Sequence, residues 1–277
     1  MKLLCAGIFL ALVACRPASS LPASDPSAST VPPSARLDEG KSEASPTPEV
    51  APTRVSKAFS PRAFETSIGG ITAEGVRFHA STHRLTVADQ SAGPGSQWPD
   101  AKSAGNGALA AINASFFNPD GSPLGLVITQ GQRRGGMNRA SSLGAGFFVE
   151  SASGRLEILR REKFQGGREA IQSGPFLVED GRTVRGLSET TSSARSFIAT
   201  DGAGGWVIVR TGPCSLAGLG RALRGAEIDG VKILTALNLD GGRSSEIWAS
   251  GALAGGPRFT RPLWNKPVRN FLVLQSR

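Results

Sequence analysis

The sequence predicts a single-domain α+β fold, with a mixed β-sheet core rich in hairpins and a few flanking helices. Short β-rich runs separated by turn residues recur along the chain after residue 58. One helix stands out, and strands and helices do not alternate strictly, so neither a Rossmann fold nor an α/β barrel is expected. The stretch 59–277, about 219 residues, is long enough for one domain with a substantial core.

Individual segments support this expectation. Three hairpins are predicted from FFVESASGRLEILR (147–160), PFLVEDGRTV (175–184) and SFIATDGAGGWVIVR (196–210). The continuous apolar runs ALAAIN (108–113) and ILTALNLD (233–240) predict central strands covered on both faces. The spacing of leucines in SLAGLGRALRGAEI (215–228) predicts a helix with Ser215 as its N-cap.

The N-terminus predicts export and lipidation. Residues 1–14 read as a signal peptide, with an apolar run too short to span a bilayer. The run ends in LVAC, which resembles the lipobox of bacterial lipoproteins and implies that Cys15 is lipidated; the alternative is an ordinary secretory signal. Residues 15–58, rich in proline and serine, predict a disordered tether. The expected location is the cell envelope, facing the periplasm from the outer membrane if the cell is Gram-negative.

The net charge and the cysteine content limit which binding partners and disulfides are expected. The chain carries a net charge of +9, and without residues 1–57 the remainder has 25 basic and 17 acidic groups, or +8. This charge suits an anionic ligand or envelope surface. The arginines are scattered and no nucleic-acid-binding motif is present, so nucleic acid is not an expected partner. Cys214 is left without a disulfide partner and is interpreted as a small structural residue.

Familiar catalytic motifs are absent from the sequence. It contains no G-x-S-x-G elbow, Walker loop, H-E-x-x-H or Cys-x-x-Cys. His79 and His83 are interpreted as the two sides of a hairpin turning at 80–82, where they would not share a face. No cofactor is required, although a divalent cation stays open because acids and amides could hold one. Carboxylates, arginines and amides must therefore carry any catalysis.

Four polar islands lie in or just after apolar runs. They are Asn113 with the loop 118–125, Gln172–Ser173–Gly174, Arg195–Ser196, and the segment LTALNLDGGRSSEIWASG (234–251). For each island alone, turn chemistry is the favoured explanation. Asp240 raises a question within the fourth island, because a core strand has no use for a bare carboxylate.

In order, the islands resemble the phosphodiester glycosidase family, whose best-known member removes N-acetylglucosamine to uncover mannose 6-phosphate. The resemblance spans roughly residues 59–274 and rests on NASFF, QSGPFLV, ARSFIATDGAGG, ALNLDGGRSS and PVRNFLVL. It implies hydrolysis of a sugar 1-phosphodiester. Arg243 departs from the family pattern, and the absence of tyrosine leaves Phe116, Phe117 or Trp248 as candidates for an aromatic sugar platform.

The chemistry of this reaction suggests roles for the islands. Phosphate is a good leaving group, so the reaction needs a cation for the departing charge and a carboxylate at the anomeric carbon. Arg195 suits the first role and Asp240 the second. The remaining candidates are substrate-binding residues: Asn113 and Gln172 for sugar hydroxyls, Gly241, Gly242, Ser244 and Ser245 for phosphate, and Ser173, Gly174, Ser196 and Asn270 nearby. A second carboxylate, Glu246 or Asp201, stays open.

Two other functions compete with hydrolysis. The domain could be a carbohydrate- or phosphate-binding envelope lipoprotein that keeps the scaffold without turnover. It could also be a structural envelope protein whose LDGG segment is a tight turn. The expected partners are a sugar phosphodiester or envelope glycan, and the membrane through the N-terminal lipid.

Overall fold

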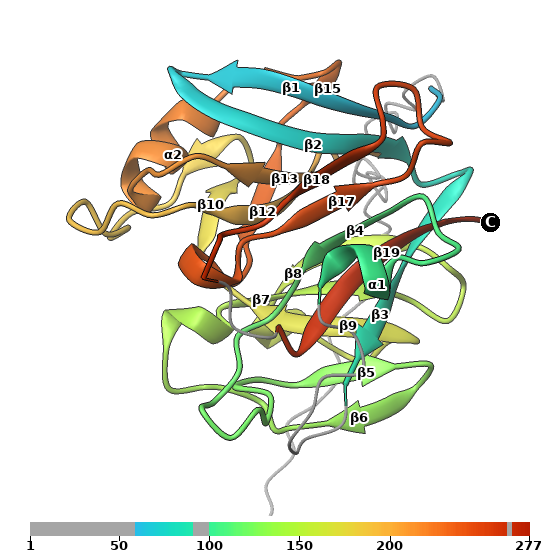
Figure 1. Cartoon of the computed structure of the whole chain (residues 1–277). Coiled ribbons are helices and arrows are strands. Elements are labelled where there is room, and N and C mark those ends of the chain that lie inside the picture. Colours follow the sequence, from blue (N-terminus) through green and yellow to red (C-terminus); the bar gives the residue numbers. More distant parts are fainter. Residues whose placement is uncertain (1–58, 91–99, 265–267) are drawn as a thin grey trace, which may run out of the picture. The chain divides into compact units, whose positions relative to one another are not determined.

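The computed structural model describes residues 59–90, 100–264 and 268–277, and all of them belong to one compact unit, Ala51–Arg277 (Figure 1). The predicted signal peptide, the predicted lipidation of Cys15 and the predicted tether 15–58 fall on residues outside the described ranges. No helix within the described ranges is long and apolar enough to cross a membrane.

The described structure contains three large antiparallel sheets, named here sheets I, II and III, and a small two-stranded sheet. Sheet I is ordered β1 (Arg62–Ile68), β2 (Ile71–His79), β13 (Gly205–Thr211), β12 (Ser196–Thr200), β16 (Thr235–Asn238), β10 (Phe176–Glu179) and β11 (Arg182–Thr183). Sheet II is ordered β18 (Arg258–Thr260), β17 (Ile247–Ala249), β4 (Ala110–Asn113), β19 (Asn270–Ser276) and β3 (His83–Asp89). Sheet III is ordered β6 (Gln132–Arg134), β5 (Val127–Thr129), β9 (Glu169–Ser173), β7 (Gly146–Glu150) and β8 (Leu156–Arg160).

Helices are few and short. Within the described ranges the α-helices are α1 (Ala101–Ala104) and α2 (Leu216–Leu223), and single 3₁₀ turns cover Ser142–Gly144, Arg161–Lys163 and Gly242–Ser244. Ser215 caps α2 as predicted, because its side chain accepts a hydrogen bond from Gly218 N. The helix ends earlier than predicted, and Glu227–Ile228 instead forms β14, which pairs with β15 (Val231–Lys232).

The predicted α+β class is wrong. Strands hold 44% and helices 10% of the described residues, so the fold is β-rich, and the sheets are antiparallel rather than mixed. The error has a physical cause. Strands β4 and β16 are buried on both faces and occupy central positions, as predicted, but other sheets supply much of their cover. β16 contacts β7 and β8 of sheet III, whereas α2 packs on β10 (Figure 1).

The main hydrophobic core is shared by all three sheets. Its members include Ile208 and Leu237 from sheet I, Ile112 from sheet II and Phe148 from sheet III. A second cluster, which contains Leu219 and Leu223 of α2, covers the other face of sheet I. Burial of large apolar side chains at the junction of three sheets holds the ends of β4, β12 and β16 in fixed positions.

The three predicted hairpins are present as β7–β8, β10–β11 and β12–β13. The predicted hairpin around His79 and His83 is wrong. The chain turns there, but β2 pairs within sheet I and β3 within sheet II. The imidazole of His79 contacts Ser81 and that of His83 contacts Thr82, so the two rings are held by separate local hydrogen bonds.

Candidate functional site

Asp240 lies just beyond the end of β16, where sheets I and II meet. Its N–H donates to the Ala114 carbonyl over 2.8 Å, and its carbonyl accepts from Asn113 Nδ2 over 2.7 Å. These two bonds join the end of β16 to the end of β4. Because its N–H and carbonyl are both bonded, the backbone of Asp240 is fixed at the strand end, and the carboxylate projects from this fixed point.

The surroundings of Asp240 change its acidity. Burial raises the pKa of Asp240 to about 6, although hydrogen bonds from the Ser244 side chain and the Gly241 N–H oppose this increase. The Gly241 N–H lies 2.9 Å from Oδ1. Near neutral pH this carboxylate is ionised yet poorly solvated, which is a suitable state for a base or a nucleophile.

Asn113 connects three of the predicted islands. Its Oδ1 accepts hydrogen bonds from the Ser196 hydroxyl at 2.6 Å and the Glu246 N–H at 3.0 Å, while Nδ2 bonds to Asp240. The residue is fully buried. The structure therefore makes Asn113 and Ser196 positioning residues, because their side chains are engaged with the protein rather than available to sugar hydroxyls.

The second island also converges on the end of β16. The Ser173 hydroxyl donates to the Asn238 carbonyl at 2.9 Å, and Asn238 Nδ2 donates to the Gly174 carbonyl at 2.9 Å. Position 174 requires glycine, because a Cβ on this residue would lie only 2.2 Å from the Ser142 carbonyl oxygen. Ser173 and Gly174 thus hold the turn that supports Leu239 and Asp240.

The side-chain amide of Gln172, predicted to orient a sugar hydroxyl, is bonded within the protein. Its Oε1 accepts from the N–H groups of Leu126 and Asn138, and its Nε2 donates to the carbonyls of Asn138 and Gly144. These four bonds satisfy the amide, and the residue is 1% exposed. Gln172 fastens two loops of sheet III together.

Asn270 anchors the first island from β19. Its Oδ1 accepts from both the N–H and the hydroxyl of Ser115, at 2.7 and 3.1 Å. Asn270 Nδ2 and the Ser245 hydroxyl are buried without a hydrogen-bond partner among the described residues. Both groups lie near the place where the polar islands meet, and they remain for water or a ligand to satisfy.

Arg195 is a nearly buried cation, 9% exposed, without a carboxylate within ion-pair distance in the described structure. Its Nε donates to the Cys214 carbonyl at 3.1 Å and its Nη2 to the Thr191 carbonyl at 2.7 Å. Burial lowers the pKa of Arg195, but a guanidinium remains charged. Nη1 makes no hydrogen bond to a described residue, and it lies 3.6 Å from where a Cβ of Gly241 would be. The free side of the cation therefore faces the Asp240 loop.

The glycines and serines of this loop have different roles from those predicted. The Gly241 N–H is bonded to Asp240 and the Gly242 N–H to the Ala194 carbonyl, so neither is free to bind phosphate. Gly242 has a φ of +62°, which favours glycine, and Gly241 allows the close approach of Arg195. The Ser244 hydroxyl bonds to the Asp240 carboxylate rather than standing free.

Neither candidate for a second carboxylate joins the site. Glu246 is fully buried, and its Oε2 lies 3.8 Å from Nε of Arg261. Asp201 accepts hydrogen bonds from the N–H groups of Ala203 and Gly205, as a turn residue does, at the far end of β12 from Arg195. No cluster of three His, Cys, Asp or Glu side chains that could hold a metal ion occurs in the described ranges.

The aromatic platform is also placed differently. Trp248 packs against α1, because a Cβ on Gly105 would lie 2.6 Å from its ring. Phe116 and Phe117 are half-buried in the loop after Ser115. The aromatic side chain that sequence reasoning missed is Trp264, whose carbonyl accepts a 3.0 Å hydrogen bond from Arg243 Nε. The run RPLW (261–264), two large apolar residues after a proline, was the available signal.

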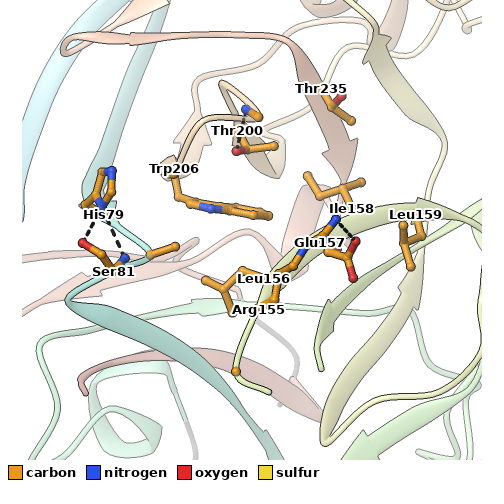
Figure 2. A pocket seen from close by; sticks show the side chains of 14 residues that line it. His79, Ser81, Arg155, Leu156, Glu157, Ile158, Leu159, Thr200, Trp206 and Thr235 are labelled. Carbon is orange, nitrogen blue, oxygen red and sulfur yellow. Dashed lines mark hydrogen bonds and ion pairs between the residues drawn. The ribbon is translucent and has the colours of Figure 1, made fainter. Parts of the chain in front are cut away.

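A larger cavity, of about 590 Å³, lies at the opposite end of β12 and β16. Figure 2 shows His79, Ser81, Thr200, Trp206 and Thr235 around it. Several of its polar side chains are bonded to one another or to nearby backbone, as in His79 to Ser81, Arg155 to Glu157 and Thr200 to the Gly205 carbonyl. Size alone does not make this cavity a better candidate than the Asp240 region, which contains a carboxylate of raised pKa and a cation without an acidic partner.

The fold of the domain is similar to that of solved glycosidase and uncharacterised structures. The zebrafish N-acetylglucosamine-1-phosphodiester α-N-acetylglucosaminidase catalytic domain, auto-inhibited by its pro-peptide, matches with a TM-score of 0.56 at 18% identity, covering 80% of this chain and 85% of that one. A hypothetical protein from Synechocystis matches with a TM-score of 0.55 at 18% identity, covering 78% and 61% of the two chains. At this identity the likeness defines the class of fold.

The sequence comparisons define the family. Residues 106–275, more than half of the chain, match the family model described as phosphodiester glycosidase, and the chain belongs to this family. The uncharacterised protein YigE of Escherichia coli K12 is 35% identical over 80 residues, a match that spans 26% of this chain and 31% of YigE. The family is one of glycosidases named for phosphodiester substrates.

The raised pKa of Asp240 predicts a pH dependence of activity. A base or nucleophile must be ionised, so kcat/KM is expected to rise with pH through about 6 and then level off. A rate profile between pH 4 and 8 measures this, with protein stability checked at each pH. A rising limb centred near 4 would show that Asp240 is not the titrating group, because an unperturbed aspartate titrates there.

Proposed function

We propose that the protein hydrolyses a sugar 1-phosphodiester at the glycosidic C1–O bond, releasing the sugar and a phosphate monoester. The observation that carries this proposal is the approach of Arg195 to the Asp240 loop: its Nη1 lies 3.6 Å from where a Cβ of Gly241, the residue after Asp240, would be. A carboxylate of raised pKa and a buried guanidinium with one unbonded nitrogen provide the two charges that the reaction needs. Membership of the phosphodiester glycosidase family supports the same substrate class.

The proposed reaction is a displacement of the phosphate at C1 by water or by Asp240. The C1–O bond breaks with its electron pair moving to the phosphate oxygen, where Arg195 stabilises the developing charge through Nη1. Asp240 either removes a proton from the attacking water or attacks C1 itself and is later released by water. Asn113 holds the backbone of Asp240, and the carbonyls of Cys214 and Thr191 hold the guanidinium of Arg195, so each charged group is fixed before substrate binds.

The test is a screen of sugar 1-phosphodiesters with the purified protein, with and without a chelator. Release of free sugar together with a phosphate monoester is the expected result. Binding of these compounds without turnover would instead favour the carbohydrate- or phosphate-binding alternative, and neither binding nor turnover would favour a structural role. Activity lost with the chelator and restored by a divalent cation would establish a metal requirement.

The proposed place of action is the cell envelope, with the protein anchored through lipid on Cys15. Cells fed a fatty-acid probe should incorporate it into the wild-type protein, and Cys15→Ala should abolish this labelling and release the protein from membranes. Cys5→Ala is the matched control, because Cys5 would leave with the signal peptide. Persistent labelling of Cys15→Ala would contradict the proposed anchor.

A further inference from the structure

A groove of about 460 Å³ opens beside the Asp240 loop, lined by Arg243, Pro262, Leu263 and Trp264. Leu263 is 96% exposed and Trp264 80% exposed, the highest values for large hydrophobic side chains in the described structure. Keeping two such side chains in water is unfavourable, and adjacent exposed apolar residues on a folded domain mark a binding surface.

The groove is physically continuous with the candidate catalytic loop. Arg243 belongs to the 3₁₀ turn Gly242–Ser244, and Ser244 bonds to the Asp240 carboxylate. From the same turn, Arg243 Nε donates to the Trp264 carbonyl at 3.0 Å. One short turn thus joins the proposed reaction centre to the groove wall. The exposed Arg243 guanidinium adds a second positive charge between them.

We propose that this groove binds a hydrocarbon chain on the leaving-group side of the substrate. On this view, which rests on the proposed function, the substrate is a sugar 1-phosphodiester whose second ester bond is to a lipid-like alcohol. A polar glycan would need several hydrogen-bonding groups in the wall, whereas Pro262, Leu263 and Trp264 present mainly carbon. The phosphate at the head of the chain would lie near the cations Arg195 and Arg243. Hydrolysis at C1–O then releases an alkyl phosphate monoester.

A binding experiment tests this without requiring turnover. The affinities of methyl phosphate and of octyl phosphate, kept below its micellar concentration, are measured by isothermal titration calorimetry with the purified protein. Each fully buried methylene strengthens binding by about fourfold, so a chain that is partly buried in an open groove should give octyl phosphate an advantage of at least ~10-fold. Trp264→Ala and Leu263→Ser should each reduce this ratio towards one, and Trp264→Phe should retain most of it.

The control is Leu234→Ser, which removes a 40% exposed leucine outside the groove and should leave the ratio unchanged. Equal affinity for the two phosphates, or a ratio that survives Trp264→Ala, would overturn the inference. So would Trp264-dependent binding to anionic vesicles without any preference for octyl phosphate, since the surface would then serve membrane docking.

Failure of the proposed function gives a different result. If no sugar phosphodiester is hydrolysed but the octyl preference depends on Trp264, the groove binds chains and hydrolysis is wrong. If octyl and methyl esters of one sugar 1-phosphate are hydrolysed with equal kcat/KM, hydrolysis stands and the groove inference fails.

Discussion

Asp240→Asn is expected to reduce kcat by at least ~10²–10⁴-fold, because the amide keeps the shape of the side chain but cannot act as a base or a nucleophile. The fold should survive. The pKa of Asp240 in the folded protein, about 6, lies above its ordinary value of 3.8, so between these pH values the folded state binds a proton that the unfolded state does not. Folding stability therefore falls as pH rises through this window, by about 3 kcal/mol in total.

In Asp240→Asn the side chain does not titrate, so the variant does not lose this folding stability as the pH rises. At pH 7 Asp240→Asn should be as stable as the wild type or more stable, while being nearly inactive, and its stability should lose the pH dependence between about 4 and 6. Melting curves and rates on the same samples measure both quantities. Asp180→Asn is the matched control, since it removes a charge from an exposed turn whose left-handed backbone also tolerates asparagine.

Two outcomes would contradict this assignment. Near wild-type turnover by Asp240→Asn would remove Asp240 from the mechanism. A loss of activity that only follows a loss of folded protein would mean that the segment is a structural turn.

Arg195→Lys is expected to lower kcat by about 10²-fold for a phosphodiester, comparable to removing one preorganised donor from a transition-state site. Lysine retains a positive charge but loses the planar fork, in which Nε and Nη2 bond to the carbonyls of Cys214 and Thr191 while Nη1 is left for the ligand. Without those two bonds the charge is no longer held at one position. Some loss of stability is expected too, because the two carbonyls lose their donors.

The choice of substrate separates these effects. The loss should be largest for a phosphate leaving group and smaller for an aryl glycoside without phosphate. Arg185→Lys, at an exposed position, is the control and should be active. An equal loss on both substrates would mean that Arg195 supports the fold of the loop rather than the departing phosphate.

The positions of Asp240 and Arg195 at strand ends could be predicted from the sequence, because the pattern that marks each of them is local. Asp240 directly follows a continuous apolar run, and a carboxylate at the end of a buried strand is costly without a purpose. Arg195 precedes a buried strand in the same way. The hairpins and the capped helix α2 were also predictable, since turn residues and leucine spacing act over a few residues.

The roles of the side-chain amides of Asn113, Gln172 and Asn270 could not be predicted from local sequence patterns. Asn113 contacts Ser196 and Asp240, residues that follow it by 83 and 127 positions, and Asn270 reaches back 155 positions to Ser115. In the sequence each looked like a ligand-binding group, whereas in the structure the carbonyl and amide groups of Asn113 and Gln172 are used to hold strands and loops together. Only the folded chain shows which polar groups are already satisfied.

The same limit explains the wrong fold class and the missed tryptophan. The apolar runs alone predict that β4 and β16 are covered on both faces, but such a run is identical whether a helix or a second sheet covers it. The packing of three sheets around one core decided that question. In the sequence nothing distinguishes Trp264 from other surface residues. In the structure the turn at Gly242 places Arg243 against the Trp264 carbonyl. This contact could not be predicted, because the position of a loop depends on long-range packing and not on its own residues.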